Sequence, residues 1–185
     1  MNVRKLMRRI AARSVAGTVA TALALAAGDV MAQSPTVTIS FTGYYNSVSC
    51  TVQGGNLNVT LPTISTTALS SAGATAGATE FNIPVLCESD VNSLVAYFQQ
   101  GPTTDADGNL NVENPTDPKS ATRVQIQLTN GDGSPIRVGD VSTVKPVSVK
   151  GSAVTSIPFF ARYYATGQAS AGTVNTYVTF ILEML

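Results

Sequence analysis

The stretch of sequence that decides the fold is 173-TVNTYVTFILEM-184. Every second residue from Val174 belongs to one row, which holds Val174, Thr176, Val178, Phe180, Leu182 and Met184. A period of two is typical of a half-buried β-strand, because successive side chains of a strand point to opposite faces. The sequence therefore predicts a long core strand that reaches almost to the last residue and leaves no room for a later strand.

The same alternation, working outward from this stretch, predicts several more short strands. No run of ten or more residues has a convincing helical stripe, and turns rich in Gly, Asn and Asp separate the runs. Many short strands in about 150 residues predict an all-β fold, an antiparallel β-sandwich. The expected strands are 37–41, 57–61, 81–87, 94–99, 124–128, 136–138, 144–150, 157–164 and 173–184.

A low-complexity segment, residues 65–79, interrupts this pattern. It consists almost entirely of Ser, Thr, Ala and Gly, and Leu69 is its only large apolar residue. Such a composition predicts an exposed connection with a short helical turn at about residues 67–71 and no chemistry of its own.

The N-terminus has the composition of a secretory signal. Five basic residues lie within the first 13, and an apolar stretch follows from Ser14 to Ala27. About 14 apolar residues are too few to span a bilayer as a helix, so residues 1–32 are interpreted as a signal peptide that is cleaved after Ala32, with a cut after Ala26 as the alternative. The predicted mature domain is 33–185, and it contains no further apolar run that would anchor it in a membrane.

Charge and composition exclude several function classes. The 11 basic and 11 acidic residues cancel in the full chain, but removal of the signal leaves six against ten, a formal charge of −4. A mildly acidic domain has no basic field that attracts nucleic acid. The chain has no His, which removes Ser-His-Asp and Cys-His catalysis and imidazole ligands for zinc. No enzyme activity, cofactor or metal site is expected.

The two cysteines, Cys50 and Cys87, fit an exported protein. They lie 37 positions apart without a C-x-x-C spacing, and an oxidising compartment favours a structural disulfide between them.

Two other groups of residues suggest chemistry less strongly. The acidic stretch 105–113 clusters oxygen ligands but lacks EF-hand spacing, so a solvated hairpin loop is the preferred interpretation. The neighbouring acids, which extend to Asp117, lie in a loop with no pattern of burial that would tune a catalytic pKa. The pairs Tyr44-Tyr45 and Tyr163-Tyr164 carry rings that stack on sugars, although alternation places one ring of each pair inward.

Taken in order, these features resemble the structural pilins of chaperone–usher fimbriae of the type 1-like class. The resemblance rests on the signal, on Cys50 after Phe41-Thr42-Gly43, on Cys87 after 81-FNIPVL-86, on 158-PFFARYYATG-167, and on Gly172 before the terminal strand. Segments 61–65 and 96–104 are similar to those of Bordetella-like major subunits.

The resemblance implies an immunoglobulin-like sandwich that lacks its final strand. It further implies export through the periplasm, binding by a periplasmic chaperone, and delivery to an outer-membrane usher, followed by assembly into a surface fimbria that serves adhesion. Its partners would be identical or related subunits, joined when the N-terminal segment of one subunit enters a groove in the next. The residues implied are Val37, Ile39 and Phe41 in the donor segment 33–41, and Val174, Val178, Phe180, Leu182 and Met184 in the acceptor groove.

The chain departs from the family pattern in two places. Met184 stands where the family commonly has an aromatic penultimate residue, and the short arm before Val37 has no Gly at the usual register position. A minor adaptor or terminator subunit, and a secreted carbohydrate-binding sandwich, are the alternatives to a shaft subunit.

Overall fold

The computed structural model describes residues 49–185, so the predicted signal peptide and donor segment lie outside the described residues. Short 3₁₀ helices η1 and η2 occupy Thr66–Leu69 and Val141–Thr143. The remaining elements are strands: β1 Cys50–Val52, β2 Thr75–Cys87, β3 Val91–Gln99, β4 Leu110–Asn111, β5 Val124–Asn130, β6 Pro135–Ile136, β7 Val147–Val149, β8 Val154–Ala165 and β9 Thr179–Met184.

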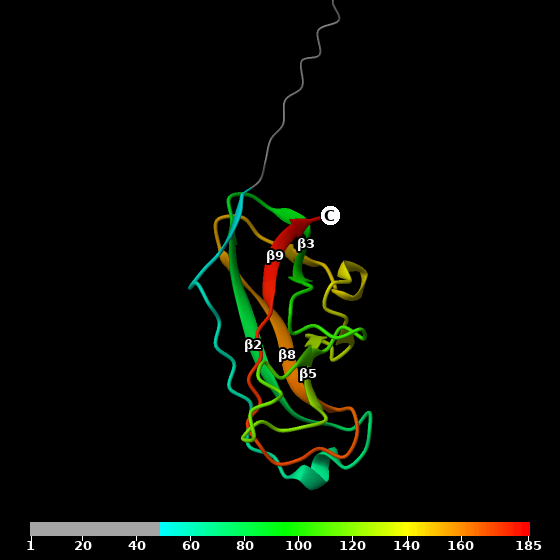
Figure 1. Ribbon diagram of the computed structural model, residues 1–185. Helices are drawn as coiled ribbons and strands as arrows, with labels where there is room; N and C mark the ends of the chain where they lie inside the picture. The colour runs from blue at the N-terminus through cyan, green and yellow to red at the C-terminus, as the bar shows by residue number, and fades with distance from the viewer. Residues whose placement is uncertain (1–48) are drawn as a thin grey trace, which may run out of the picture. The chain divides into compact units, whose positions relative to one another are not determined.

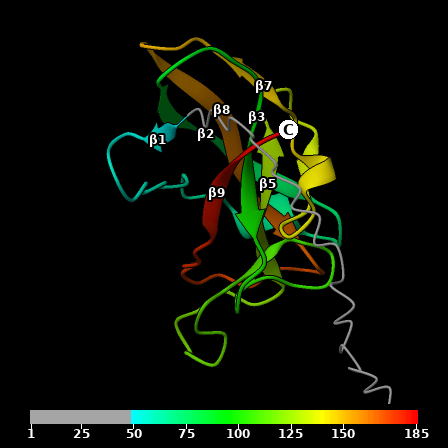
Figure 2. The ribbon, with the colours of Figure 1, turned by 90° about the horizontal axis from the view of Figure 1, so that it is seen from above.

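The strands form two antiparallel sheets, which confirms the predicted all-β sandwich. One sheet has the order β1-β2-β8-β5-β4, with β6 also paired to β5, and the other has the order β7-β3-β9. Figure 1 shows β9 crossing in front of the long strands β2 and β8. In both views β1 and β9, which are edge strands of different sheets, lie toward the same side of the sandwich (Figures 1 and 2).

The core lies between the sheets and is built by alternate residues of the long strands. Ile83, Val85 and Leu94 are fully buried, and Phe98 packs edge-on against Phe159 with ring centroids 5.2 Å apart. Because alternate residues of a strand share a face, β2 contributes Ile83, Val85 and Cys87 to this one layer.

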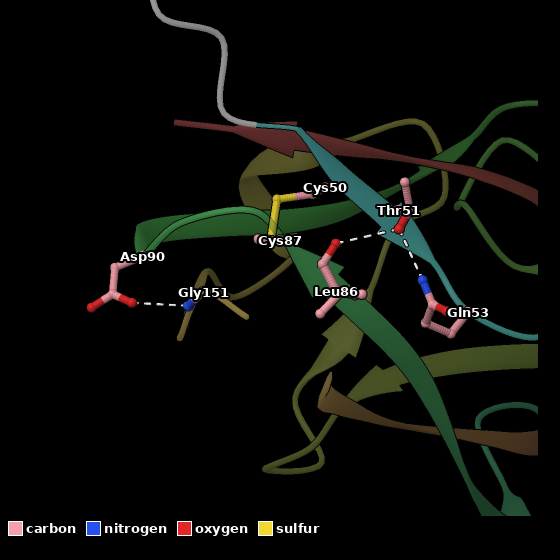
Figure 3. Close-up of a disulfide and its surroundings, with 7 residues drawn as sticks. All are labelled: Cys50, Thr51, Gln53, Leu86, Cys87, Asp90 and Gly151. Carbon is pink, nitrogen blue, oxygen red and sulfur yellow. Dashed lines mark hydrogen bonds between the residues drawn. A yellow bond between two sulfur atoms is a disulfide. The ribbon is translucent and has the colours of Figure 1, made fainter. Parts of the chain in front are cut away.

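A disulfide joins Cys50 to Cys87, as predicted, and ties the short strand β1 to the end of β2 (Figure 3). The two cysteines are directly opposite each other in the antiparallel ladder. Thr51 and Gln53 add side-chain hydrogen bonds near this junction, the first from Thr51 Oγ1 to the carbonyl of Leu86 at 3.4 Å. The disulfide therefore fixes a strand that has only three residues of pairing.

The low-complexity segment 65–79 is only partly a connection between strands, because its last residues belong to β2. Its helical turn is confirmed as η1, which Ser65 caps through its hydroxyl. The prediction was wrong for Thr75–Thr79, which belong to β2 and pair with β8. Small residues suit this part of β2 because the ladder bulges between Ala76 and Thr79, and Gly77 lies at a φ of 64° close to the ring of Tyr163.

Several predicted strands were wrong in extent: 136–138 and 144–150, for example, are observed as the shorter β6 and β7. Residues 57–61 keep their alternation, with Val59 and Leu61 packed against the core, but they form no strand because no neighbour pairs with them among the described residues. The terminal strand begins at Thr179 rather than Thr173, since residues 173–177 bond to loops instead of to a strand.

The acidic loop is folded against the first sheet rather than being a freely solvated hairpin. One carboxylate oxygen of Asp105 accepts hydrogen bonds from the amides of Asp107 and Asn109 at 3.0 and 2.8 Å, and the other accepts one from Gln125 at 2.7 Å. Leu110–Asn111 then pairs with β5 as β4. Asp105 is thus a structural residue that holds the loop on β5.

Within residues 49–185 no helix is long and apolar enough to cross a membrane.

Candidate functional site

The C-terminal strand β9 is paired along one edge only. Its register with β3 runs from Leu94 opposite Met184 to Gln99 opposite Thr179, and the amide of Leu185 extends the ladder by donating to the carbonyl of Ser93 at 3.0 Å. No strand of residues 49–185 pairs with its other edge. An unpaired strand edge offers a row of main-chain donors and acceptors to another chain.

The hydrogen bond of Leu185 fixes which residues present that free edge. In an antiparallel ladder, hydrogen-bonded and non-hydrogen-bonded pairs alternate. Because Leu185 and Ser93 form a hydrogen-bonded pair, Glu183, Ile181 and Thr179 also direct their main-chain groups toward β3. Phe180, Leu182 and Met184 therefore direct theirs away from β3, toward the unpaired edge.

The chain preceding β9 continues the same arrangement. The carbonyls of Thr173, Asn175 and Tyr177 accept hydrogen bonds of 2.9, 2.8 and 2.7 Å, all from the loop segment 103–121. The odd-numbered residues thus bond to one flank throughout 173–185. The even-numbered residues present their main-chain groups to the opposite flank, which makes one continuous edge from Val174 to Met184.

The side chains of these even-numbered residues form an apolar row that faces the core. Val174, Val178, Phe180 and Leu182 all pack against the main core cluster while staying half-buried. Phe180 lies 6.0 Å from Phe98, centroid to centroid. The structure therefore places four of the five predicted groove residues together, in a strip of core that is only partly covered.

Met184, the fifth predicted groove residue, lies apart from this packing. It is 49% exposed and is not among the side chains packed against the core cluster. Its position opposite Leu94 puts it at the end of the paired strand, where the sandwich ends. The predicted donor residues Val37, Ile39 and Phe41 lie outside the described residues.

Thr176 is a member of the row that the sequence-based choice of groove residues left out. Its hydroxyl oxygen is inaccessible to solvent and has no hydrogen-bond partner. The signal that identifies it is its even position between Val174 and Val178, in a row of residues that is otherwise apolar. A buried hydroxyl without a partner is rare in folded proteins. Thr176 is therefore an unsatisfied polar side chain within an otherwise apolar row.

The strip carries no ionisable side chain, so the chemistry it offers is that of a backbone edge with apolar side chains. The shifted carboxyl groups lie elsewhere: hydrogen bonds from neighbouring groups lower the pKa of Asp90, Asp132 and Asp140. Burial raises the pKa of Tyr163. Among residues 49–185 no three His, Cys, Asp or Glu side chains are grouped as a metal site.

Comparison with known proteins gives a consistent picture. The family model described as fimbrial protein matches residues 39–184. The type-1 fimbrial protein A chain of Escherichia coli K12 is 32% identical, covering 92% of this chain and 97% of that protein. The fimbrial protein FimX of Bordetella pertussis is also 32% identical, over 85% of this chain and 92% of its own length.

Among solved structures, a subunit from a chaperone–usher pilus superimposes with a TM-score of 0.57 at 14% identity. The match covers 82% of this chain and the whole of that one. At this level of identity the likeness shows the fold alone.

Proposed function

The chain belongs to the fimbrial protein family and is a structural subunit of a surface pilus, and we propose that it polymerises by donor-strand exchange. In this proposal, residues 33–41 of one copy add to the unpaired edge of β9 in the next copy. Val37, Ile39 and Phe41 then cover the half-buried row of Val174, Val178, Phe180 and Leu182.

The observation that carries the proposal is the coincidence of an unpaired edge with an uncovered strip of core. Main-chain hydrogen bonds supply part of the affinity of strand addition, and alternate side chains in pockets supply its specificity. The donor segment alternates Val37, Ile39 and Phe41 with Thr38 and Ser40, so one of its faces matches the apolar row. Covering one large apolar side chain fully typically stabilises by about 1.5–3 kcal/mol.

Exchange of this kind produces a filament. The donor and acceptor surfaces of one copy differ, so the contact is head-to-tail and does not close on itself. Export of residues 33–185 after removal of the signal peptide 1–32, protection of the edge by a periplasmic chaperone, and transfer at an outer-membrane usher complete the proposed route.

A proline at Met184 tests the role of the edge directly. The main-chain N–H of Met184 points away from β3, so Met184→Pro removes a donor from the unpaired edge without breaking the pairing with β3. Met184→Ala is the matched control, because it shortens the same exposed side chain and keeps the N–H. Both variants are expressed in the periplasm with the chaperone and usher and compared on unboiled denaturing gels.

We expect wild type and Met184→Ala to give ladders that collapse to one band on boiling. We expect the Met184→Pro ladders to dissociate about fivefold faster. This factor corresponds to the loss of one main-chain hydrogen bond that contributes about 1 kcal/mol. Identical ladders from Met184→Pro and Met184→Ala argue against strand addition at this edge. A single band from unboiled wild type contradicts the whole proposal.

A further inference from the structure

A second site lies on the flank of residues 173–177 that faces away from the proposed donor strand. A cavity of about 520 Å³ opens between the start of β5, the segment after β4, and Tyr177. Its volume lies within the range of about 300–1,000 Å³ that is usual for small-molecule sites. Because Tyr177 belongs to the odd-numbered row, strand addition along the other edge of β9 leaves this cavity open.

Three side chains that line the cavity are without partners in the described part of the chain. No hydrogen bond or ion pair joins the guanidinium of Arg123, the carboxylate of Glu113 or the phenol of Tyr177 to another described residue. Tyr177 is 49% exposed. The cavity therefore presents a cation, an anion and an aromatic face that the fold itself does not use.

The backbone of Arg123 is held in an unusual conformation at this place. Its φ is 56°, in the left-handed region that non-glycine residues seldom occupy, and its carbonyl accepts a hydrogen bond from the amide of Thr166 at 3.0 Å. The side chain lies across Gly167, where an added Cβ would come within 3.1 Å of the Arg123 Cδ. Such strain is commonly found where a residue is held for a function.

Two amide side chains of the cavity lining are held by hydrogen bonds within the fold. Gln125, only 7% exposed, is fixed by hydrogen bonds from its amide nitrogen to Asp105 at 2.7 Å and to Asn111 at 2.9 Å. Asn111 and Gln125 both line the cavity. The Gln125 oxygen also accepts a hydrogen bond from Asn109 at 3.3 Å, so this amide shapes the cavity and the polar groups left for a ligand are those of Arg123, Glu113 and Tyr177.

We propose that this cavity binds a carboxylated monosaccharide, as the terminal residue of a glycan. A guanidinium binds a carboxylate through two parallel hydrogen bonds, and the ring of Tyr177 offers an apolar face to a pyranose. Glu113 accepts hydrogen bonds from hydroxyl groups. The lining holds one arginine and the carboxylate of Glu113, a balance of charge that favours a sugar with a single carboxylate over a polyanion.

The test is a titration of purified fimbriae, or of the folded full-length exported chain, with glucuronic acid and N-acetylneuraminic acid. Binding is followed by ligand-detected NMR, with glucose and free glutamate as comparison ligands. We expect saturable binding of an acidic sugar, at least about tenfold weaker in Arg123→Gln because one charge-assisted contact is lost. Arg137→Gln, which replaces an exposed arginine that does not line the cavity, keeps the wild-type affinity.

Absence of saturable binding by either acidic sugar overturns the proposal, as does equal binding of glucose. Unchanged affinity in Arg123→Gln, or preference for glutamate, also overturns it. Tyr177→Ala provides the same comparison should Arg123→Gln fail to fold. The outcome is independent of polymerisation, which the gel ladders report separately.

Discussion

At the scale of single residues, Thr176 is a polar residue in an apolar environment. Its neighbours in the inward row are Val174 and Val178, and its own hydroxyl is buried without a partner. A hydroxyl in such a place loses its hydrogen bonds to water and gains none in return. Thr176 therefore lowers the free energy of unfolding of the isolated subunit.

Replacement of Thr176 by valine, which has nearly the same shape, is expected to stabilise the folded monomer. Removing a buried unsatisfied hydroxyl typically gains about 1 kcal/mol or more in free energy of unfolding. Urea unfolding of the full exported chain measures the change. Thr179→Val, at an exposed position three residues further along the chain, should shift the free energy of unfolding by less than about 0.5 kcal/mol. A loss of stability in Thr176→Val would show that the hydroxyl has a partner in solution.

At the scale of elements, turns far apart in the sequence are joined by one carboxylate. Asp90, in the turn between β2 and β3, accepts a hydrogen bond of 2.8 Å from the amide of Gly151, in the turn between β7 and β8 (Figure 3). It also pairs with Lys150 of that turn at 2.9 Å. Gly151 is required there, because an added Cβ would lie 2.4 Å from the backbone of Ser89. The contact connects the ends of both sheets.

This junction predicts a loss of stability in acid. The amide of Gly151, followed by Lys150, lowers the pKa of Asp90 below its ordinary value of 3.8. A carboxyl group with a lowered folded-state pKa stabilises the fold fully above its ordinary value, and this stabilisation is lost progressively as the pH falls from that value through the folded-state pKa. In urea unfolding between pH 7 and pH 2, Asp90→Asn should be less stable than wild type at pH 7, and the difference should shrink as the pH falls below 3.8.

Glu88→Gln is the control for this comparison, because the side chain of Glu88 makes no hydrogen bond or ion pair with the described residues. This substitution should leave the urea midpoint at pH 7 unchanged. Parallel pH profiles of wild type and Asp90→Asn down to pH 2 would contradict a role for the carboxylate charge.

Sequence patterns placed some of the strands correctly and others with wrong bounds. Alternation located β5 and the inner face of β9, because a period of two indicates an extended segment with an apolar face. It did not indicate burial of the polar residues of β5, since Gln125, Thr129 and Asn130 are buried too. It misplaced the bounds at residues 57–61 and 173–178, because a strand is defined by a neighbour that pairs with it, and alternation carries no information about neighbours.

At the scale of the whole molecule, the disulfide closes the beginning of the described chain onto the sandwich. Cys87 is fully buried at the end of β2, whereas β1 has three paired residues. The edge strand β1 and residues up to Leu61, which include half-buried Val52 and Val59, therefore depend on this covalent tie for their position against the core.

Replacing both cysteines by serine is expected to lower the free energy of unfolding by about 3–4 kcal/mol, the loop-closure value for a separation of this length. Urea unfolding of the double variant measures this, and wild type in the presence of a reductant should show a similar drop. A difference of less than about 1 kcal/mol would mean that packing alone holds β1 in place.

The sequence by itself determined the fold class, the single disulfide and the apolar row of the C-terminal strand. These follow from local patterns: a period of two, the count of cysteines, and the order of side chains along one strand. It also placed Val174, Val178, Phe180 and Leu182 on one face, and these four lie together in the structure.

Only the tertiary structure decided which edge of β9 is unpaired, that Met184 lies outside the packed row, and that Arg123, Glu113 and Tyr177 share a cavity. The reason is physical. Burial leaves a local periodic trace in a strand, whereas pairing and the meeting of distant loops depend on contacts between residues whose separation along the chain leaves no such trace.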